Sequence, residues 1–364
     1  MNQKEIIYTG AISELKVILK SYGSKNIFLV RGKKSFNVCG AKAAIEKIAK
    51  KYSFTEYFDF SNNPKFEEAE LGYEKLKKSN SDLLIAIGGG SVIDMAKLIK
   101  NFQIRADNAE NLPFIAIPTT AGTGSEATCF AVVYKNGIKD STENEKLLPD
   151  YVIIDSNLMQ GQSEYQMAVS GIDAFSQAIE SMWSVNSNPE SLIYSEKAIH
   201  LIWFNLQKAI KGNKDALIAV AMGAHLAGKA INITKTTAPH ALSYGFTSIF
   251  GLPHGHAVAL FLTYFFYLHK RVDIDNCADE RGIQYVIQTI KRISEIINVS
   301  FDDIELEIMK FIKCLGLIVN FEDLNITIDD YLLSISKLNY DRLKNNPVKV
   351  SQNNLTEIFY YNKN

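Results

Sequence analysis

The sequence predicts two domains, an N-terminal α/β domain that is Rossmann-like and a C-terminal domain that is all-α. Strand-like and helix-like segments alternate in the first part of the chain, and from about residue 163 the apolar residues follow helical spacing only. The length of 364 residues also favours two domains over one small module. Because no linker or low-complexity tract separates the halves, the change of period alone places the domains at 1–158 and 159–364.

The N-terminal half contains short runs of β-branched and aromatic residues, with amphipathic stretches between them. The predicted helices are 41–51 and 66–78, and the predicted strands are 25–30, 56–60, 82–87, 113–117, 128–134, 138–142 and 151–155. Repeated strand-helix-strand order implies a parallel sheet covered by helices. Asn136-Gly137 lies between two of the runs and predicts a type I′ hairpin.

The C-terminal half shows no convincing strand. Its apolar spacing predicts helices over 167–185, 189–211, 215–231, 257–268, 283–297 and 304–315. We therefore expect an all-helical second domain.

The composition excludes several classes of partner. Lys plus Arg is 39 and Asp plus Glu is 40, so the net charge of −1 offers no general positive field to nucleic acid or an anionic membrane. The most apolar stretch, 257–268, is too short to span a bilayer, and residues 1–10 lack the apolar core of an export signal. The four cysteines show no metal-binding spacing and argue against a disulfide framework. We expect a cytoplasmic protein.

A glycine-rich turn joins a predicted strand to a predicted helix in DLLIAIGGGSVIDMAK, residues 82–97. Gly88, Gly89 and Gly90 leave the backbone amides open, Ser91 starts the helix, and Asp94 follows as a capping-box partner. Such a helix start binds phosphate through its amides and its dipole. Glycines that merely form a tight turn are the alternative.

A second loop of hydroxyls and glycines follows the next predicted strand, in PTTAGTGSE at 118–126. It contains Thr119, Thr120 and Thr123, whose hydroxyls could also serve only the loop itself. Ligands of open α/β sheets bind beyond the carboxyl ends of the strands. Two such loops on neighbouring strands therefore favour a cofactor that carries a diphosphate.

The helical half contains candidate metal ligands. Asp173 and Gln177 are four residues apart and share a helix face, and His240 and His254 follow later in the chain. A carboxylate with two imidazoles suits Fe²⁺ or Zn²⁺. An exposed helix pair and two loop histidines are the alternative interpretation.

Four motifs in order along the chain resemble those of the iron-containing, or group III, alcohol dehydrogenases, whose fold is dehydroquinate synthase-like. They are GGGSVIDMAK at 88–97, PTTAGTGSE at 118–126, GIDAFSQAIE at 171–180 and HALSYGFTSIFGLPHG at 240–255. The resemblance covers both domains. It implies NADPH or NADH and a divalent metal, Fe²⁺ or Zn²⁺, as cofactors, with the substrate in the cleft between the domains.

The resemblance also implies roles for individual residues. It implies metal binding by Asp173, His240 and His254, with Gln177 where the family usually has a fourth ligand, a histidine. An amide oxygen is a weaker ligand than imidazole, so a lower affinity, a harder ion or an added water are the alternatives. The residues expected at the dinucleotide are Gly32, Asn63, Gly89, Gly90, Ser91, Asp94, Thr119, Thr120, Thr123 and Lys139.

Two further departures from the family pattern bear on chemistry. Tyr244 stands where many members carry a second histidine, and it is expected either to donate a proton or to line the pocket. Gly32 in LVRGKKSF replaces the aspartate that often binds the ribose 2′-hydroxyl, and Arg31, Lys33 and Lys34 surround it. Without that carboxylate a 2′-phosphate is not repelled, so we expect NADPH to be accepted.

Three phrases are most similar to the phosphonoacetaldehyde-reducing branch of the family. They are SQAIESMWSVNS at 176–187, KAINITKTTAPHALSY at 229–244 and NYDRLKNNPVKV at 339–350. This similarity implies an acidic aldehyde as substrate, bound by Lys229, Lys235, Thr236 and Thr237, with Arg342 as a more distant contact. Tyr244 and Lys235 are the expected catalytic residues.

The expected reaction is the NAD(P)H-dependent reduction of phosphonoacetaldehyde to 2-hydroxyethylphosphonate by a metal-dependent reductase. A general iron- or zinc-dependent alcohol dehydrogenase, a dehydroquinate synthase-like lyase and an inactive cofactor-binding protein are the alternatives. The metal's identity is left open, and so is formation of a homodimer.

Overall fold

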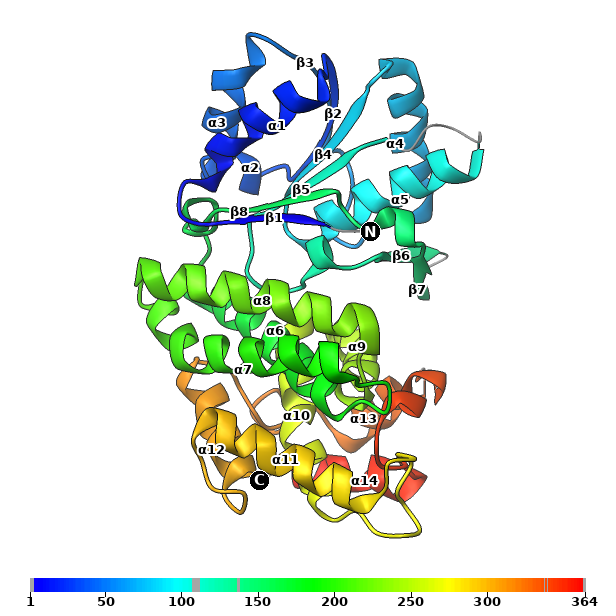
Figure 1. Ribbon diagram of the computed structural model, residues 1–364. Coiled ribbons are helices and arrows are strands. Elements are labelled where there is room, and N and C mark those ends of the chain that lie inside the picture. Colours follow the sequence, from blue (N-terminus) through cyan, green and yellow to red (C-terminus); the bar gives the residue numbers. More distant parts are fainter. Residues whose placement is uncertain (1–2, 107–111, 136–137, 337, 339, 363–364) are drawn as a thin grey trace. The chain divides into compact units, whose positions relative to one another are not determined.

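The computed structural model describes the chain except for residues 1–2, 107–111, 136–137, 337, 339 and 363–364 (Figure 1). The chain forms two compact units, Met1–Gln162 and Ser163–Asn364. Unit 1 is α/β and unit 2 is helical (Figure 1), which confirms the predicted fold class.

Unit 1 is built on a six-stranded sheet in the order β1-β8-β5-β4-β2-β3. Every pairing in this sheet is parallel. The strands are β1 (Lys4–Ile7), β2 (Asn26–Arg31), β3 (Ser53–Tyr57), β4 (Leu83–Gly88), β5 (Phe114–Pro118) and β8 (Tyr151–Ile154). β4 is buried at every position, because helices cover both faces of a parallel sheet.

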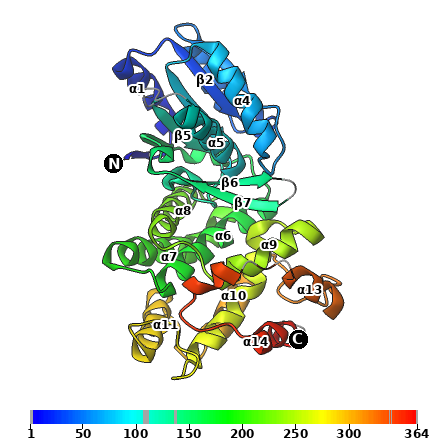
Figure 2. The same cartoon turned by 90° about the vertical axis from the view of Figure 1, so that its right-hand side faces the viewer.

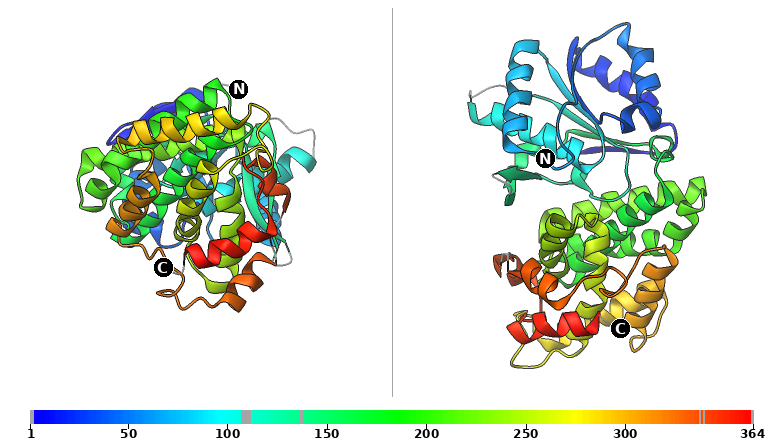
Figure 3. Two further views of the ribbon diagram at one scale, coloured as in Figure 1. Left: turned by 90° about the horizontal axis from the view of Figure 1, so that it is seen from below. Right: turned by 180° about the vertical axis from the view of Figure 1, so that it is seen from behind.

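The helices of unit 1 pack on opposite faces of the sheet because neighbouring strand residues point in opposite directions. Phe28 shares one apolar cluster with Tyr73 of α4. Leu29 shares another with Leu19 of α1. The right-hand view in Figure 3 shows the blue helices and the light blue helices on the two sides of the sheet. The helices are η1 (Ala11–Glu14), α1 (Leu15–Tyr22), α2 (Ser35–Val38), α3 (Ala41–Ala49), α4 (Phe66–Ser79), α5 (Gly90–Ala106), η2 (Ser125–Ala127), η3 (Glu145–Leu147) and η4 (Ser156–Met159).

An antiparallel hairpin, β6 (Phe130–Lys135) with β7 (Ile138–Glu143), forms the second sheet (Figure 2). The two strands agree with the predicted pair. Asn136 and Gly137, on which the turn type was predicted, lie outside the described residues.

Unit 2 is built around α6, which is buried along most of its length against α7, α8 and α10. Its N-terminus is capped by the hydroxyl of Ser163, which accepts a hydrogen bond from the backbone of Gln166. The later helix α13 packs against α9 (Figure 2). The helices are α6 (Glu164–Trp183), α7 (Pro189–Ile210), α8 (Lys214–Thr234), α9 (Ala238–Phe250), α10 (His254–Lys270), α11 (Ile283–Ile297), α12 (Ile304–Cys314), α13 (Ile328–Ile335), η5 (Tyr340–Asn345) and α14 (Gln352–Tyr361).

Several predicted elements need correction. The run at 25–30 is the second strand, because β1 precedes it, and the strand predicted at 56–60 is β3 at Ser53–Tyr57. α9, α13 and α14 were not predicted. By length and hydropathy α8 could cross a bilayer, but 67% of its most apolar window is buried inside the protein, as in a core helix. All four cysteines are free thiols.

Candidate functional site

Two loops meet at the carboxyl ends of β4 and β5. The two strands pair so that Gly88 lies opposite Pro118, and the Thr119 amide donates a hydrogen bond of 3.0 Å to the Gly88 carbonyl. A Cβ atom at Gly90 would lie 2.5 Å from Thr123 Oγ1, so only glycine allows this approach. The first turn of α5 is thus placed beside the loop of threonines at 118–126, called here the threonine loop.

This edge of the sheet is also where the strand order reverses. The chain runs from β2 outward to β3 and then returns to the other side of β2 to form β4. The Gly32 amide, just after β2, donates to the carbonyl of Ile87 in β4 at 3.4 Å. A crevice at such a reversal is the usual ligand site of an open parallel sheet. Gly32, the glycine turn at 88–90 and the threonine loop therefore lie at the carboxyl ends of neighbouring strands, where a nucleotide would be expected to bind.

Asp94 and Lys97 of α5 form hydrogen bonds with the threonine loop and the residues that follow it. The Asp94 carboxylate accepts hydrogen bonds from the Ser125 hydroxyl and from the Val132 amide at 3.2 Å. The Lys97 ammonium is buried and donates to Thr128 Oγ1 and to the Phe130 carbonyl, both at 2.8 Å. Burial lowers the pKa of Lys97 to about 8, although the Asp94 and Glu126 carboxylates oppose this shift.

These contacts correct one expectation and add a residue. α5 already begins at Gly90, so Ser91 lies inside the first turn and is not its N-cap. Asp94 therefore positions the threonine loop instead of completing a capping box. Lys97 lies in the same motif, three residues after Asp94 on the same helix face, and that spacing was the available signal for it.

The remaining expected cofactor residues lie around this edge. Thr119 is buried, and Asn63 follows β3 in an exposed loop, where its carbonyl accepts a hydrogen bond from the Ser61 hydroxyl at 2.9 Å. The side chain of Lys139 falls outside the described part of the protein.

Two of the three cations expected near the second ribose, Arg31 and Lys33, already have partners. Arg31 Nε lies 2.7 Å from a Glu56 carboxylate oxygen, and its guanidinium stacks on Phe58 at 3.8 Å. Lys33 forms an exposed ion pair of 2.7 Å with Asp59. A 2′-phosphate would compete with these two carboxylates, so the cluster favours NADPH less than its three charges suggest.

A candidate metal centre lies in unit 2. Asp173 comes from α6, His240 from α9, and His254 is the first residue of α10. One ligand atom from each of the three side chains lies within 4.8 Å of the other two. His240 Nε2 is 3.3 Å from Asp173 Oδ1. Asp173 and Gln177 are both buried, so the interpretation as an exposed helix pair is wrong, and both histidines lie on helices, not in loops.

Glu180 supports His240 and was not predicted. One of its carboxylate oxygens contacts His240 Nδ1, and the other accepts hydrogen bonds from the amide (2.7 Å) and hydroxyl (2.8 Å) of Thr237. Burial alone would lower the pKa of His240, but the carboxylates of Glu180 and Asp173 raise it to about 9. A carboxylate behind a histidine fixes the ring and leaves its other nitrogen for a metal. The signal in the sequence was the i, i+4, i+7 spacing of Asp173, Gln177 and Glu180.

His254 is held by other contacts. The Ser243 hydroxyl lies 3.3 Å from His254 Nδ1, and the Tyr244 ring stacks on the imidazole at 5.6 Å with the planes 10° apart. Gly255 lets α10 touch α6, because a Cβ there would lie 2.1 Å from the Val169 carbonyl oxygen. These contacts place His254 beside Asp173.

The donor set fits a divalent metal. One carboxylate and two imidazoles are common ligands of Zn²⁺ and Fe²⁺, and the second carboxylate, Glu180, is already committed to orienting His240. Gln177 lies one turn after Asp173, and its side-chain oxygen is buried on the same side of α6. Gln177 is therefore the candidate for the fourth ligand position.

Four of the expected substrate residues have different surroundings. Thr237 is buried, and its hydroxyl donates to Glu180 and accepts from Trp183 Nε1 at 2.8 Å, so it supports the metal centre instead of facing a substrate. The Lys229 ammonium lies over the Tyr194 ring at 4.6 Å. Arg342 is nearer than expected, since its Nη1 donates to the Tyr244 hydroxyl at 2.8 Å. Lys235 follows the last turn of α8.

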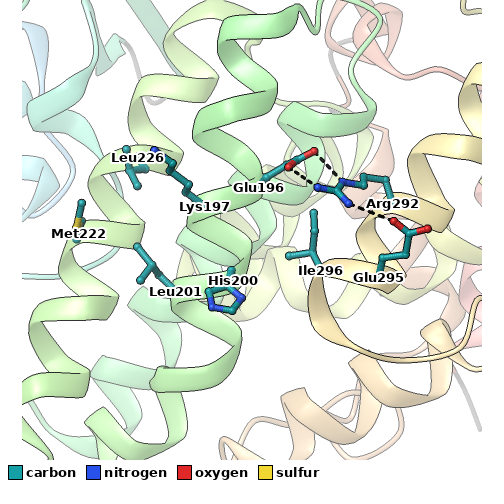
Figure 4. A pocket seen from close by; sticks show the side chains of 9 residues that line it. All are labelled: Glu196, Lys197, His200, Leu201, Met222, Leu226, Arg292, Glu295 and Ile296. Carbon is teal, nitrogen blue, oxygen red and sulfur yellow. Dashed lines mark hydrogen bonds and ion pairs between the residues drawn. The ribbon is translucent and has the colours of Figure 1, made fainter.

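A separate hollow of about 520 Å³ lies on unit 2 between α7, α8 and α11 (Figure 4). Arg292 at its rim is paired with both Glu196 and Glu295, and Met222 and Leu226 add apolar surface. None of the expected site residues lines it. Its charges neutralise one another, so it offers no chemistry like that of the metal centre.

A glycine-lined nucleotide site at the reversal of a parallel sheet, with a carboxylate and two imidazoles in a helical unit, defines a metal-dependent oxidoreductase linked to a dinucleotide. The sequence matches "Iron-containing alcohol dehydrogenase" over residues 2–156 and "Fe-containing alcohol dehydrogenase family, C-terminal" over residues 167–362. The chain belongs to the iron-containing alcohol dehydrogenase family, as its motifs predicted.

Relatives with known names agree with this assignment. The chain is 29% identical to a phosphonoacetaldehyde reductase of Streptomyces viridochromogenes over 77% of its own length and 76% of that protein. It is 32% identical to long-chain-alcohol dehydrogenase 1 of Geobacillus thermodenitrificans over 70% of its length and 69% of that protein.

Solved structures give the same result. The crystal structure of a sulfoacetaldehyde reductase from Bifidobacterium kashiwanohense in complex with NAD⁺ is similar with a TM-score of 0.88 and 26% identity, covering 99% of this chain and 96% of that one. This neighbour, the family and the Asp-His cluster support the expected nicotinamide and metal cofactors.

Proposed function

We propose that this protein reduces small aldehydes that carry an anionic group, with phosphonoacetaldehyde as the substrate and 2-hydroxyethylphosphonate as the product. NADPH or NADH is the reductant, and the cytoplasm is the proposed compartment. The observation that carries the proposal is a stack next to the metal centre, in which Arg342 contacts Tyr244 and Tyr244 lies against His254. A guanidinium at this place can bind the oxygens of a phosphonate.

Arg342 is suited to bind an external anion. Among the residues that the structure describes, no carboxylate lies within ion-pair distance of its guanidinium. Arg31 and Arg292, by contrast, are paired with glutamates. The two relatives named as reductases of phosphonoacetaldehyde and sulfoacetaldehyde act on aldehydes with an acidic group, which also supports this substrate class.

The reaction divides between bound groups and protein side chains. When bound, a dihydronicotinamide would supply the hydride for the carbonyl carbon. A divalent metal would be held by Asp173, His240 and His254, with Gln177 as the fourth ligand, and would supply Lewis acidity. Tyr244 donates its phenolic proton to the carbonyl oxygen, which completes the alcohol. A guanidinium only donates hydrogen bonds, so the bond from Arg342 to the Tyr244 oxygen does not use the phenolic proton of Tyr244. Water returns the proton to Tyr244.

The test compares phosphonoacetaldehyde with acetaldehyde, following the loss of NADPH or NADH with and without a chelator. We expect kcat/KM to be about 10- to 100-fold higher for phosphonoacetaldehyde, the range of one or two charged hydrogen bonds. Arg342→Met removes this preference, and Lys344→Met, in the same short helix and exposed in a pair with Asp341, keeps it. Equal rates for both aldehydes in the unaltered enzyme contradict the proposal.

A general alcohol dehydrogenase is the second candidate, favoured by the 32% identity to long-chain-alcohol dehydrogenase 1. Faster turnover of butanal or longer aldehydes than of phosphonoacetaldehyde supports it. Product formation without net oxidation of the cofactor indicates a lyase of the dehydroquinate synthase type instead.

A further inference from the structure

An arginine and a glutamate are bonded to each other at the carboxyl ends of β2 and β3. Arg31 is the last residue of β2, and Glu56 lies in β3, opposite Leu29 of β2. Arg31 Nε donates to the Glu56 carboxylate at 2.7 Å. Because β2 and β5 are the two neighbours of β4, the pair lies on the other side of the glycine turn from the threonine loop, next to Gly32.

The Arg31 guanidinium is held beside Gly32 by its neighbours. Its Cζ atom lies 4.9 Å from the centroid of the Phe36 ring and 3.8 Å from that of the Phe58 ring, and its Nη1 donates to the Gly32 carbonyl at 3.2 Å. A guanidinium has five N–H groups, and the bonds to Glu56 and Gly32 use two of them. An oxyanion next to Gly32 can bind the same guanidinium through the others.

Residue 32 itself brings no charge to this position. Gly32 has no side chain, and a Cβ atom there would lie 2.1 Å from Ser35 Oγ. The Ser35 hydroxyl therefore lies in the space that a larger side chain at residue 32 would need. A hydroxyl can accept a hydrogen bond from a ribose 2′-hydroxyl and can donate one to a 2′-phosphate. This neutral group suits both cofactors, so the charged pair beside it decides between them.

The pair combines two groups that select opposite cofactors. Next to the ribose of a dinucleotide, a carboxylate favours NAD by binding the 2′-hydroxyl, and an arginine favours NADP by binding the 2′-phosphate. The side chain of Arg31 is 13% exposed and that of Glu56 is 37% exposed, so solvent screens this pair less than the exposed pair of Lys33 with Asp59. The negative charge of Glu56 therefore opposes the attraction of Arg31 for a 2′-phosphate.

We infer that Glu56 is a specificity-determining residue of the nucleotide site. Because it neutralises Arg31, it lowers the affinity for NADPH and has little effect on the affinity for NADH, so the protein uses either cofactor. This inference rests on the reductant of the proposed function but not on the aldehyde, because nucleotide binding is measured without a substrate.

The experiment measures the dissociation constants of NADPH and NADH from the fluorescence of the reduced nicotinamide. Glu56→Gln keeps the size of the side chain and removes its charge, so NADPH should bind about tenfold more tightly, the effect of one partly exposed charged contact. The value for NADH should change by less than about twofold, because a 2′-hydroxyl carries no charge. Glu74→Gln is the matched control, since it makes the same change of net charge in an exposed pair with Lys77 on α4 and should leave both values unchanged.

A second variant tests whether Glu56 acts through Arg31. Arg31→Met should weaken the binding of NADPH more than that of NADH, and Glu56→Gln added to it should bring no gain. Adenosine 2′,5′-bisphosphate and AMP, used as probes in place of the whole cofactors, should reproduce the gain for the 2′-phosphate alone.

Three results overturn the inference. They are no tighter binding of NADPH by Glu56→Gln, a gain that persists without Arg31, and equal losses of NADPH and NADH affinity in Arg31→Met. If the unaltered protein binds neither cofactor, the proposed function fails, and the two adenosine probes still decide the role of Glu56.

Discussion

Binding of the divalent metal should strengthen steeply as the pH rises from about 7 to 9. Without a metal, His240 lies between the carboxylates of Asp173 and Glu180, which raise its pKa to about 9 in spite of burial. An imidazole binds a metal only when it is neutral at the ligating nitrogen, so each metal bound below this pH releases a proton from His240.

The size of the effect follows from the pKa. A pH of 7 is about two units below the pKa of His240. Well below the pKa, each pH unit changes the neutral fraction of the imidazole tenfold, which corresponds to ~1.4 kcal/mol. Because half of His240 is still protonated at pH 9, the apparent dissociation constant for Zn²⁺ should be about 50-fold higher at pH 7 than at pH 9. It should fall about ninefold between pH 7 and 8 and about fivefold between pH 8 and 9.

The assay is a titration of metal-free protein with chelator-buffered Zn²⁺ at several pH values. Calorimetry in buffers with different ionisation enthalpies then counts the released protons. Glu180→Gln removes one of the two carboxylates, so the pH dependence should flatten, while the affinity at pH 9 falls by about 10- to 100-fold. His200→Gln, a change on α7 outside the metal centre, should leave the slope intact. An affinity that does not change between pH 7 and 9, with no proton released, refutes the reasoning.

The stability of the metal-free protein also depends on the protonation of His240. The pKa of His240 is about 9 in the folded protein and 6.5 in the unfolded chain. Protonated His240 therefore stabilises the fold fully below pH 6.5, and this stabilisation is lost as the pH rises through 9. We expect the free energy of unfolding to fall by about 3 kcal/mol over this window. Denaturant melts at several pH values measure it, and saturating Zn²⁺ should remove the loss.

Three substitutions test other contacts. Gly255→Ala brings a Cβ to 2.1 Å from the Val169 carbonyl oxygen, so α10 should shift, weakening Zn²⁺ binding and lowering the melting temperature; unchanged metal affinity would contradict this. Lys97→Met leaves the buried acceptors of the threonine loop without their donor and should cost about 3 kcal/mol in a denaturant melt, whereas a loss below about 1 kcal/mol contradicts the buried-ammonium role. Tyr244→Phe keeps the ring against His254 but removes the proton, so kcat should fall at least ~100-fold with Zn²⁺ affinity unchanged; retention of kcat shows that Tyr244 only lines the pocket.

The sequence predicted the fold class because the change from alternating elements to helices is a local property of each half. β1 was missed because KEII has only two apolar residues and is not buried, so its strand conformation depends on pairing with β8. α9 was missed because glycine, serine, threonine and aromatic residues give it little helix propensity. Its start is fixed by Glu180, which accepts the hydrogen bonds of Thr237 from another helix.

The candidate metal ligands could also be predicted because their signals are local in the sequence. Asp173, His240 and His254 belong to residue types that bind metals, and they stand in recognisable motifs. Glu180 stands in the same motif as Asp173, but its partner lies 60 residues away on α9, and helical spacing cannot show that pairing. The substrate role expected for Thr237 failed because its burial, and its contact with Trp183, depend on how α6 and α9 pack.

The position of β8 between β1 and β5 has a consequence for how unit 1 folds during synthesis. β1 has no partner in the sheet except β8, and the two strands meet through residues 147 positions apart, as in the contact between Lys4 and Tyr151. The ribosome therefore releases the first strand long before its neighbour exists. The sheet can be completed only after almost the whole of unit 1 has emerged. Because contacts between residues far apart in the sequence form slowly, the pairing of β1 with β8 should limit the folding rate of unit 1.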